Sequence, residues 1–199
     1  MIYLTPLCGC SSAVESQPSK LVVWVRLPSP APQIPNAKAF GIFSFWRIGD
    51  RLMKADNLSF VLFENIGDKE LEIIKECYCK PEIERFVSID KDSFWIYATE
   101  TENVYFYKVY NDDILSGTVH CELCDGVLYL AVVVFPEFQN KKIGTAMVNA
   151  VLDGITGLEF NEIQVSVDEK NAASLKLFRN IGFVQTGQED ELVEFKYIM

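Results

Sequence analysis

Residues 128–152 read LYLAVVVFPEFQNKKIGTAMVNAVL. The apolar, β-branched run from Leu128 to Phe135 is typical of a buried strand, and Pro136 ends it. Beyond Gly144 the apolar residues recur at helical spacing, which predicts an amphipathic helix. A helix start exposes unpaired backbone N–H groups and the positive end of the helix dipole. This strand–turn–helix junction therefore favours a phosphate-bearing ligand.

Two lysines in the turn strengthen the expectation of a phosphate site. Lys141 and Lys142 add positive charge there, although the chain as a whole has a net charge of −10. Gly144 would let the backbone approach a ligand closely. By itself, a turn with one glycine is a weak signal, because a capped helix with solvated lysines explains the same residues.

The flanking sequence predicts a mixed α/β domain. Asp125-Gly126 is the strongest hairpin signal in the chain, and pairing about it sets Glu122 opposite Tyr129 and His120 opposite Ala131. Asp68 and Asn171 are predicted helix N-caps, and Gly182 a helix stop. The remaining predicted strands are 58–63, 94–99, 104–110, 163–168, 183–184 and 192–198, and the predicted helices are 68–77, 144–155 and 172–181.

The composition indicates a globular protein. Of 199 residues, 49% are hydrophobic, and the longest apolar run is too short to span a bilayer. The negative net charge argues against a general affinity for nucleic acids or anionic lipid surfaces. It is compatible with a cationic substrate such as an amine, and equally with an acidic protein that its charge keeps dispersed.

The cysteines leave two interpretations open. Six are present in closely spaced pairs, and Cys121-x-x-Cys124 has the spacing of a zinc knuckle. Because the hairpin turn Asp125-Gly126 follows at once, reduced cysteines that pack as small hydrophobes are favoured over a metal site. His120 is the only histidine, so no catalytic triad that needs another histidine can be assembled. We expect no metal.

Residues 1–52 differ in kind from residues 53–199. They contain five basic and two acidic residues in an otherwise acidic chain, and they lack sustained periodicity. The stretch from Cys8 to Pro32 can be back-translated into DNA that resembles a bacterial glycine tRNA gene. Residues 49–53 can be written as a ribosome-binding site before a start codon. We expect translation to begin at Met53; the alternative is a real, poorly ordered extension.

Two blocks of sequence resemble the GNAT superfamily of N-acetyltransferases. In the first, Pro136-Glu137-Phe138 closes a strand, and residues 139–144 (QNKKIG) follow where the family has Gln/Arg-x-x-Gly-x-Gly/Ala. The second corresponds to the family pattern Asn-x-x-Ser/Ala-x-x-Leu-Tyr-x-x-x-Gly-Phe. Its residues here are Asn171, Ser174, Leu177, Phe178, Gly182 and Phe183. In element order, the resemblance covers residues 53–199.

The resemblance implies an acetyl-CoA site at the junction. The main chain of residues 132–134 is expected to bond the pantetheine arm and to polarise the thioester carbonyl. Backbone N–H groups from Asn140 to Thr145 are expected to hold the pyrophosphate. The expected coenzyme-binding residues are Val132, Val133, Val134, Gln139, Asn140, Lys141, Lys142, Ile143, Gly144, Thr145, Asn171, Ser174 and Phe178.

Three positions depart from the family pattern. Lys142 replaces the first motif glycine, and Phe178 stands where a tyrosine often protonates the departing thiolate. Ser166 stands where some relatives have a glutamate base. Glu122 and Tyr129 are the candidate catalytic residues, because their pairing across the hairpin lets both face the acceptor. Each also has a purely structural interpretation.

In fold, the resemblance implies a mainly antiparallel central sheet with a splayed pair of strands, flanked by helices. In function, it implies transfer of an acetyl group from acetyl-CoA to an amine of a small molecule or protein by direct attack. The alternative is a catalytically weak or inactive acetyl-CoA-binding module that serves as a sensor or interaction subunit. We expect a cytoplasmic bacterial protein, monomeric or homodimeric, without nucleic acid or membrane partners.

Overall fold

The computed structural model describes residues 53–55, 57–87, 89–90 and 93–199. Residues 1–52, for which the sequence analysis predicts an extension or a gene-calling artefact, lie outside the described residues. The described chain forms one mixed α/β layer structure around an eight-stranded sheet. In the described part of the chain, no helix is long and apolar enough to cross a membrane.

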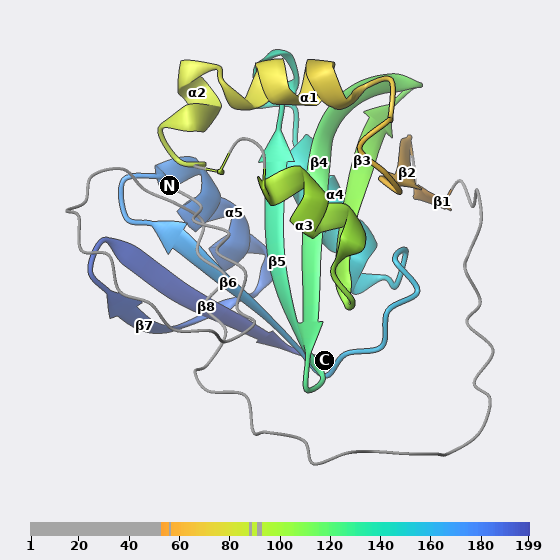
Figure 1. Cartoon of the computed structure of the whole chain (residues 1–199). Helices are drawn as coiled ribbons and strands as arrows, with labels where there is room; N and C mark the ends of the chain where they lie inside the picture. The colour runs from red at the N-terminus through yellow and green to blue at the C-terminus, as the bar shows by residue number, and fades with distance from the viewer. Residues whose placement is uncertain (1–52, 56, 88, 91–92) are drawn as a thin grey trace, which may run out of the picture.

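The sheet has the spatial order β1-β2-β3-β4-β5-β6-β8-β7 and is antiparallel throughout except at β5 and β6 (Figure 1). This confirms the mixed α/β class and the predicted mainly antiparallel sheet. The strands are β1 (Met53–Ala55), β2 (Leu58–Leu62), β3 (Val104–Asn111), β4 (Ile114–Cys124), β5 (Val127–Val134), β6 (Glu162–Asp168), β7 (Val184–Glu189) and β8 (Leu192–Ile198).

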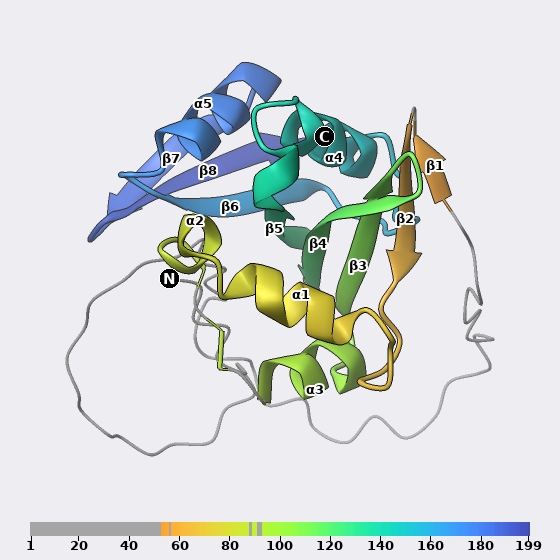
Figure 2. The ribbon, with the colours of Figure 1, turned by 90° about the horizontal axis from the view of Figure 1, so that it is seen from above.

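Helices cover both faces of the sheet. Seen from above, α1, α2 and α3 lie on one face, and α4 and α5 lie on the other (Figure 2). A 3-10 turn, η1, connects β5 to α4. The helices are α1 (Leu71–Tyr78), α2 (Pro81–Glu84), α3 (Ser93–Glu100), η1 (Pro136–Phe138), α4 (Ile143–Leu152) and α5 (Ala172–Ile181).

Two separate apolar clusters hold these layers together. On the α4–α5 face, buried side chains of six strands (β2 to β6 and β8) pack with Met147 and Val151 of α4 and Phe178 of α5. On the other face, Ile74 of α1 and Phe94 of α3 pack against residues of β3 and β5. Strand residues alternate between the two faces, so each central strand contributes to both clusters.

Where the turn chemistry is specific, the observed elements match the predicted ones. The β4–β5 hairpin has the predicted register, with Glu122 opposite Tyr129 and His120 opposite Ala131. Asn171 caps α5 by accepting a hydrogen bond from Ser174 N at 3.1 Å, and Gly182 ends the helix in a left-handed conformation. These predictions are confirmed.

The predicted strand at 94–99 is wrong, because residues 93–100 form α3. Aromatic and β-branched composition favours a strand, but Phe94 and Ala98 are both buried at helical spacing, and Trp95 is buried beside them. The Thr99 hydroxyl also donates back to Trp95 O at 2.9 Å, as hydroxyls do inside helices. Packing on the sheet thus overrides the local preference.

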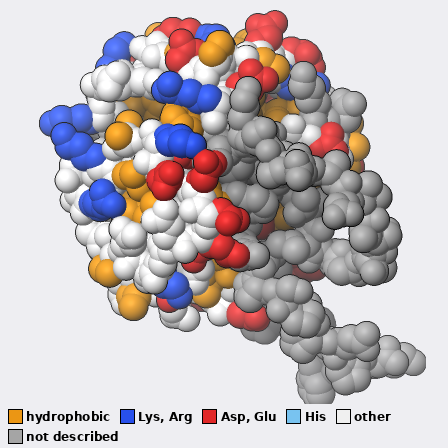
Figure 3. All heavy atoms as spheres, turned by 90° about the vertical axis from the view of Figure 1, so that its left-hand side faces the viewer, with side chains coloured by type: hydrophobic (Ala, Val, Ile, Leu, Met, Phe, Trp, Pro, Cys, Tyr) orange, Lys and Arg blue, Asp and Glu red, His pale blue; other side chains and the backbone are white. Residues whose placement is uncertain are grey.

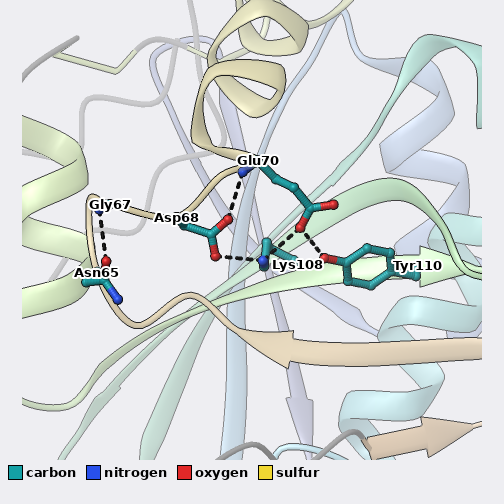
Figure 4. A network of polar contacts seen from close by, with 6 residues as sticks. All are labelled: Asn65, Gly67, Asp68, Glu70, Lys108 and Tyr110. Atoms are coloured by element: carbon teal, nitrogen blue, oxygen red, sulfur yellow. Dashed lines mark hydrogen bonds and ion pairs between the residues drawn. The ribbon is translucent and has the colours of Figure 1, made fainter.

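A buried charge network ties α1 to the sheet (Figure 4). Lys108 of β3 contacts Asp68 at 2.6 Å and Glu70 at 2.8 Å, and the Tyr110 hydroxyl also donates to Glu70. The sequence predicts Asp68 as the N-cap of a helix over residues 68–77, but the helix begins at Leu71. Its Oδ1 instead accepts from Glu70 N at 2.9 Å, so it orders the turn before the helix.

Candidate active site

Strands β5 and β6 lie side by side for only three residue pairs. The register pairs Val127 with Glu162, Leu128 with Ile163 and Tyr129 with Gln164. Residues 130–134 of β5 have no described partner on β6, which continues along β8 to Asp168. From Tyr129 onward the two strands therefore diverge (Figure 1). The splayed pair of strands predicted from the sequence is confirmed.

The pairing of β5 with β4 decides which main-chain groups face this divergence. Phe135 N donates to Ser116 O at 2.9 Å, so the main chain of Phe135 faces β4. The bonding direction alternates along an antiparallel pair, so Val133 also faces β4. The N–H and C=O groups of Val132 and Val134 point the opposite way, into the divergence. The main chain of residues 132–134 is expected to bond the pantetheine arm. The register leaves the main-chain groups of Val132 and Val134, and not those of Val133, available for this.

The turn after β5 orients the start of α4. Gln139 Nε2 donates to Val134 O at 3.1 Å, which fixes the turn to the end of the strand. Asn140 and Lys142 have left-handed backbone conformations, with φ of 60° and 64°. Lys142 is the N-cap of α4 and makes no side-chain capping bond. The first amides of α4 therefore lack both intrahelical and side-chain acceptors, as an anion site at a helix start requires.

Gly144 allows α4 to pack closely. A Cβ at this position would lie 2.9 Å from Leu177 Cδ1 and 3.3 Å from Val134 Cγ2. From the sequence, we expect the glycine to admit a ligand to the backbone. The contacts show that it also admits two neighbouring side chains, one from α5 and one from the end of β5. A larger residue would move the start of α4 away from the divergence.

Basic side chains collect around this end of the molecule. Exposed Lys141 and Lys142 lie at the start of α4, and exposed Lys176 and Arg179 lie on α5. Figure 3 views the molecule from the left-hand side of Figure 1, and Lys and Arg side chains gather on the left of that view. Asp and Glu side chains lie toward its middle. A positive patch beside an uncapped helix start suits a phosphate ligand.

The α5 residues have clear structural roles. Asn171 and Ser174 form the helix cap described above. Phe178 is buried; its ring meets Phe183 edge to face at 5.0 Å and stacks with Phe195 at 6.5 Å between ring centroids. Phe178 therefore lies in the core on the α4–α5 face, and its ring has no proton to donate.

A polar cluster lies on the opposite face, one strand from the divergence. Val119 and Cys121 of β4 pack toward α4, so His120 and Glu122 face α1–α3. Glu122 is opposite Tyr129, the last residue of β5 that pairs with β6. Both are buried, with 6% and 5% of their surface exposed. The structure thus brings together the two predicted catalytic residues at the point where the strands separate.

Burial dominates the electrostatics of this cluster. It raises the pKa of Glu122 to about 7, although a hydrogen bond from the Tyr97 hydroxyl favours the ionised form. It lowers the pKa of His120 to about 3, so this imidazole is neutral at physiological pH. Burial also raises the pKa of Tyr129. A carboxyl group with a pKa near neutrality can exchange a proton with a substrate amine.

A family model described as "Acetyltransferase (GNAT) family" matches residues 69–183. The chain belongs to the GNAT family. No curated protein matches it. The match contains both sequence blocks, the diverging strands and the start of α4, so the resemblance proposed from the motifs is confirmed.

Solved structures of GNAT acetyltransferases share the fold. Spermidine N-acetyltransferase from Vibrio cholerae, in complex with CoA and spermine, has a TM-score of 0.60 and 18% identity, covering 72% of this chain and 96% of that one. N-acetyltransferase PseH from Campylobacter jejuni has a TM-score of 0.58 and 14% identity, with 71% and 98% covered. Ribosomal-protein-S5-alanine acetyltransferase from Vibrio fischeri has a TM-score of 0.57 and 14% identity, covering 75% of this chain and 97% of that one.

The structure shows the cost of one departure from the GNAT pattern. Lys142 occupies the first motif glycine, and its φ of 64° is a conformation that glycine adopts without strain. A lysine here retains the turn at some energetic cost and adds a charge beside the helix start. Ser166, at the other departure, is a buried residue of β6.

Two members of the polar cluster, Tyr97 and His120, are not among the catalytic residues predicted from the sequence. Tyr97 was assigned to a strand, and only its true place on α3 brings its hydroxyl to Glu122. His120 was considered only as a metal or triad residue. Among the described residues, no group of three His, Cys, Asp or Glu side chains could hold a metal ion. The hairpin register, which sets His120 two residues from Glu122 on the same face, was the signal that could have found it.

Proposed function

We propose that this protein is an N-acetyltransferase that transfers an acetyl group from acetyl-CoA to an amine of a small molecule or protein. The observation that carries the proposal is the divergence of β5 and β6 beside an uncapped helix start. Main-chain groups of Val132 and Val134 point into that divergence. The start of α4 and its two lysines supply a site for phosphate at one end.

Acetyl-CoA would supply the acetyl group as an activated thioester. In the proposed arrangement, Val132 N–H or Val134 N–H donates to the thioester carbonyl as negative charge develops on it. The amides at the start of α4, together with Lys141 and Lys142, bind the pyrophosphate. Thr145 and the residues of the α5 cap, Asn171 and Ser174, lie on the elements that flank this site. Phe178 contributes packing.

Glu122 is the proposed base. Its carboxylate removes a proton from the acceptor ammonium, and the neutral amine then attacks the thioester carbon. Tyr129, at the point of divergence, orients the acceptor amine beside Glu122. With Phe178 in place of a tyrosine, the thiolate leaves without help from that position, so we expect the proton to come from the attacking amine.

The relatives suggest acceptors for a first panel. One similar structure contains spermine, and another is named for an alanine of a ribosomal protein. We propose testing CoA release from acetyl-CoA with polyamines, small primary amines and peptides with free N-termini, beside calorimetric binding of acetyl-CoA. Turnover on one class identifies the acceptor, and absence of acetyl-CoA binding would refute the proposal.

Binding without turnover would favour a coenzyme-binding module. Phe178 and Ser166 are the features that favour this second candidate, because both stand where relatives carry proton-transfer groups. Gly144→Leu should weaken coenzyme binding in either case, because the new side chain displaces α4 from Val134 and Leu177. Gly187→Leu is the matched control, since a Cβ at Gly187 has no neighbour within 4 Å.

A further inference from the structure

Glu122 and Lys108 are both buried on the α1–α3 side of the sheet, but only Lys108 has side chains of opposite charge beside it. Lys108 has two carboxylates, those of Asp68 and Glu70, within 2.8 Å. In the described part of the chain, the only basic side chain within 4.0 Å of the Glu122 carboxylate is His120. A buried charge without a counter-charge is costly and is found mainly at functional sites.

The groups around Glu122 come from three elements. Tyr97 faces it from α3, Tyr129 from β5, and His120 and Cys124 from β4. None of them carries a positive charge at neutral pH, because burial keeps His120 neutral. The ionised form of Glu122 therefore depends on neutral hydrogen-bond donors for its stabilisation.

His120 is held where it can be such a donor. Its ring lies among Phe94, Phe106 and Tyr97, with centroid distances of 5.8, 6.1 and 6.5 Å. In the described structure neither ring nitrogen has a hydrogen-bond partner, although the side chain is only 4% exposed. Nε2 lies 3.5 Å from Glu122 Oε1. A buried polar group without a partner is costly, so a hydrogen bond from Nε2 to Glu122 Oε1 would relieve that cost.

We propose that His120 is a positioning residue for Glu122: its imidazole donates from Nε2 to the Glu122 carboxylate and stabilises the ionised form that accepts the amine proton. The inference rests on the proposed function. When the acceptor ammonium reacts, one of its N–H bonds breaks and an O–H bond forms on the other oxygen of Glu122. The electron pair stays on the amine nitrogen, and His120 retains its proton.

The sign of the effect follows from the strengths of the two hydrogen bonds. A donor to a carboxylate makes a charge-assisted bond, which is roughly twice as strong as a bond between neutral groups. Removing that donor therefore destabilises the carboxylate more than the protonated acid. The variant His120→Phe, which keeps a ring in the aromatic surroundings, should raise the titration midpoint of Glu122 by about one pH unit.

The test follows the carbon-13 signal of the Glu122 carboxyl in the full-length free protein over a pH titration. The Glu122→Gln variant assigns the signal. His120→Gln, whose amide nitrogen can donate from the same position, should leave the midpoint near the wild-type value. Tyr97→Phe removes the other donor and should shift the midpoint in the same direction as His120→Phe. His120→Leu replaces His120→Phe if the latter does not fold.

An unchanged or lowered midpoint in His120→Phe would overturn the inference, as would equal shifts in His120→Phe and His120→Gln. Where an acceptor is known, the acidic limb of the kcat/KM profile should move with the midpoint. The titration needs no activity, so its failure is distinguishable from failure of the proposed function. A shifted midpoint in a protein that acetylates nothing would support the His120–Glu122 contact and reject the acetyltransferase proposal.

Discussion

At the scale of single residues, the role proposed for Glu122 requires an ionised carboxylate that burial makes unfavourable for stability. Its pKa is raised to about 7, compared with about 4.3 for an unperturbed glutamate. A raised carboxyl pKa means that folding favours the protonated acid. The favourable contribution is therefore complete below about pH 4, and it is lost as pH rises from there to about 7.

We predict that Glu122→Gln abolishes most acetyl transfer and stabilises the protein at alkaline pH. Relative to wild type, the free energy of unfolding of the variant should rise between pH 4 and pH 8, by about 3 kcal/mol. Urea unfolding at several pH values measures this difference. Exposed Glu102→Gln is the control, and it should show little pH dependence. A Glu122→Gln difference that is flat with pH would contradict the prediction.

Lys142 is the second residue at which a cost is visible. A non-glycine residue in the left-handed region is strained by about 1–2 kcal/mol, and glycine costs about 0.4–1 kcal/mol more chain entropy on folding. Lys142→Gly should therefore leave the free energy of unfolding unchanged or raise it by about 1 kcal/mol. Lys141→Gly removes the same charge at a residue without positive φ, and it should destabilise the protein. Thermal unfolding of the two variants checks the contrast.

The same pair of variants separates charge from conformation in coenzyme binding. If Lys142 acts through its charge, both variants weaken acetyl-CoA binding, and added salt reduces the difference from wild type. If the backbone conformation matters more, Lys142→Gly binds as well as wild type does. Calorimetry at two salt concentrations distinguishes these outcomes.

At the scale of elements, the Lys108 network decides how firmly α1 is held. Burial alone would lower the pKa of Lys108, but hydrogen bonds to Asp68 and Glu70 raise it, so the side chain stays charged. This network joins the start of α1 to β3, two elements that are far apart in the sequence.

We predict that Lys108→Met destabilises the protein by about 2–3 kcal/mol, because Asp68 and Glu70 lose their counter-charge while partly buried. Amide hydrogen exchange should increase most in α1. Lys75→Met breaks only the exposed contact with Glu72 and should cost less than about 1 kcal/mol. Equal costs for the two variants would show that the network contributes no more than a surface ion pair.

Elements with specific turn or cap residues could be predicted from the sequence, and elements defined by packing could not. Asp125-Gly126 set the β4–β5 register residue by residue, and Asn171 and Gly182 set the ends of α5. The predicted strand at 94–99 is a helix, because its aromatic side chains pack on the buried face of α3. The short helix α2 has too little periodicity to be recognised from its four residues.

The same distinction between local signals and packing applies to the candidate site. The proposed coenzyme side depends on one contiguous turn, so a local motif was enough to propose it. Its polar cluster depends on contacts between α3 and β4, which no local pattern encodes. The orientation of Val133 toward β4 follows only from a register extended to Phe135 and Ser116.

At the scale of the whole molecule, the sheet has two halves joined at three residue pairs of β5 and β6. Coenzyme bound in the divergence would contact β5, α4 and α5 together. We predict that acetyl-CoA slows amide exchange at Val132, Val134 and residues 143–145 in parallel. At a free concentration of 100 times Kd, it should stabilise the protein by about 2.7 kcal/mol.

Hydrogen exchange and thermal unfolding at several acetyl-CoA concentrations test this prediction. Protection confined to α4 would mean that only the phosphate end binds, and it would argue against the proposed role of Val132. The β1–β2 pair lies at the far edge of the sheet and provides the internal control, because its exchange should change little.

The two apolar clusters on opposite faces of the sheet have a consequence for how this protein can evolve. The α4–α5 cluster supports the proposed coenzyme site, whereas the α1–α3 cluster supports the side on which Glu122 lies. Phe138 is the one described side chain that packs against both. Mutations in separate clusters have nearly independent effects on stability. If the proposed function holds, substitutions in α1–α3 could change the acceptor while leaving the stability of the α4–α5 side nearly unchanged.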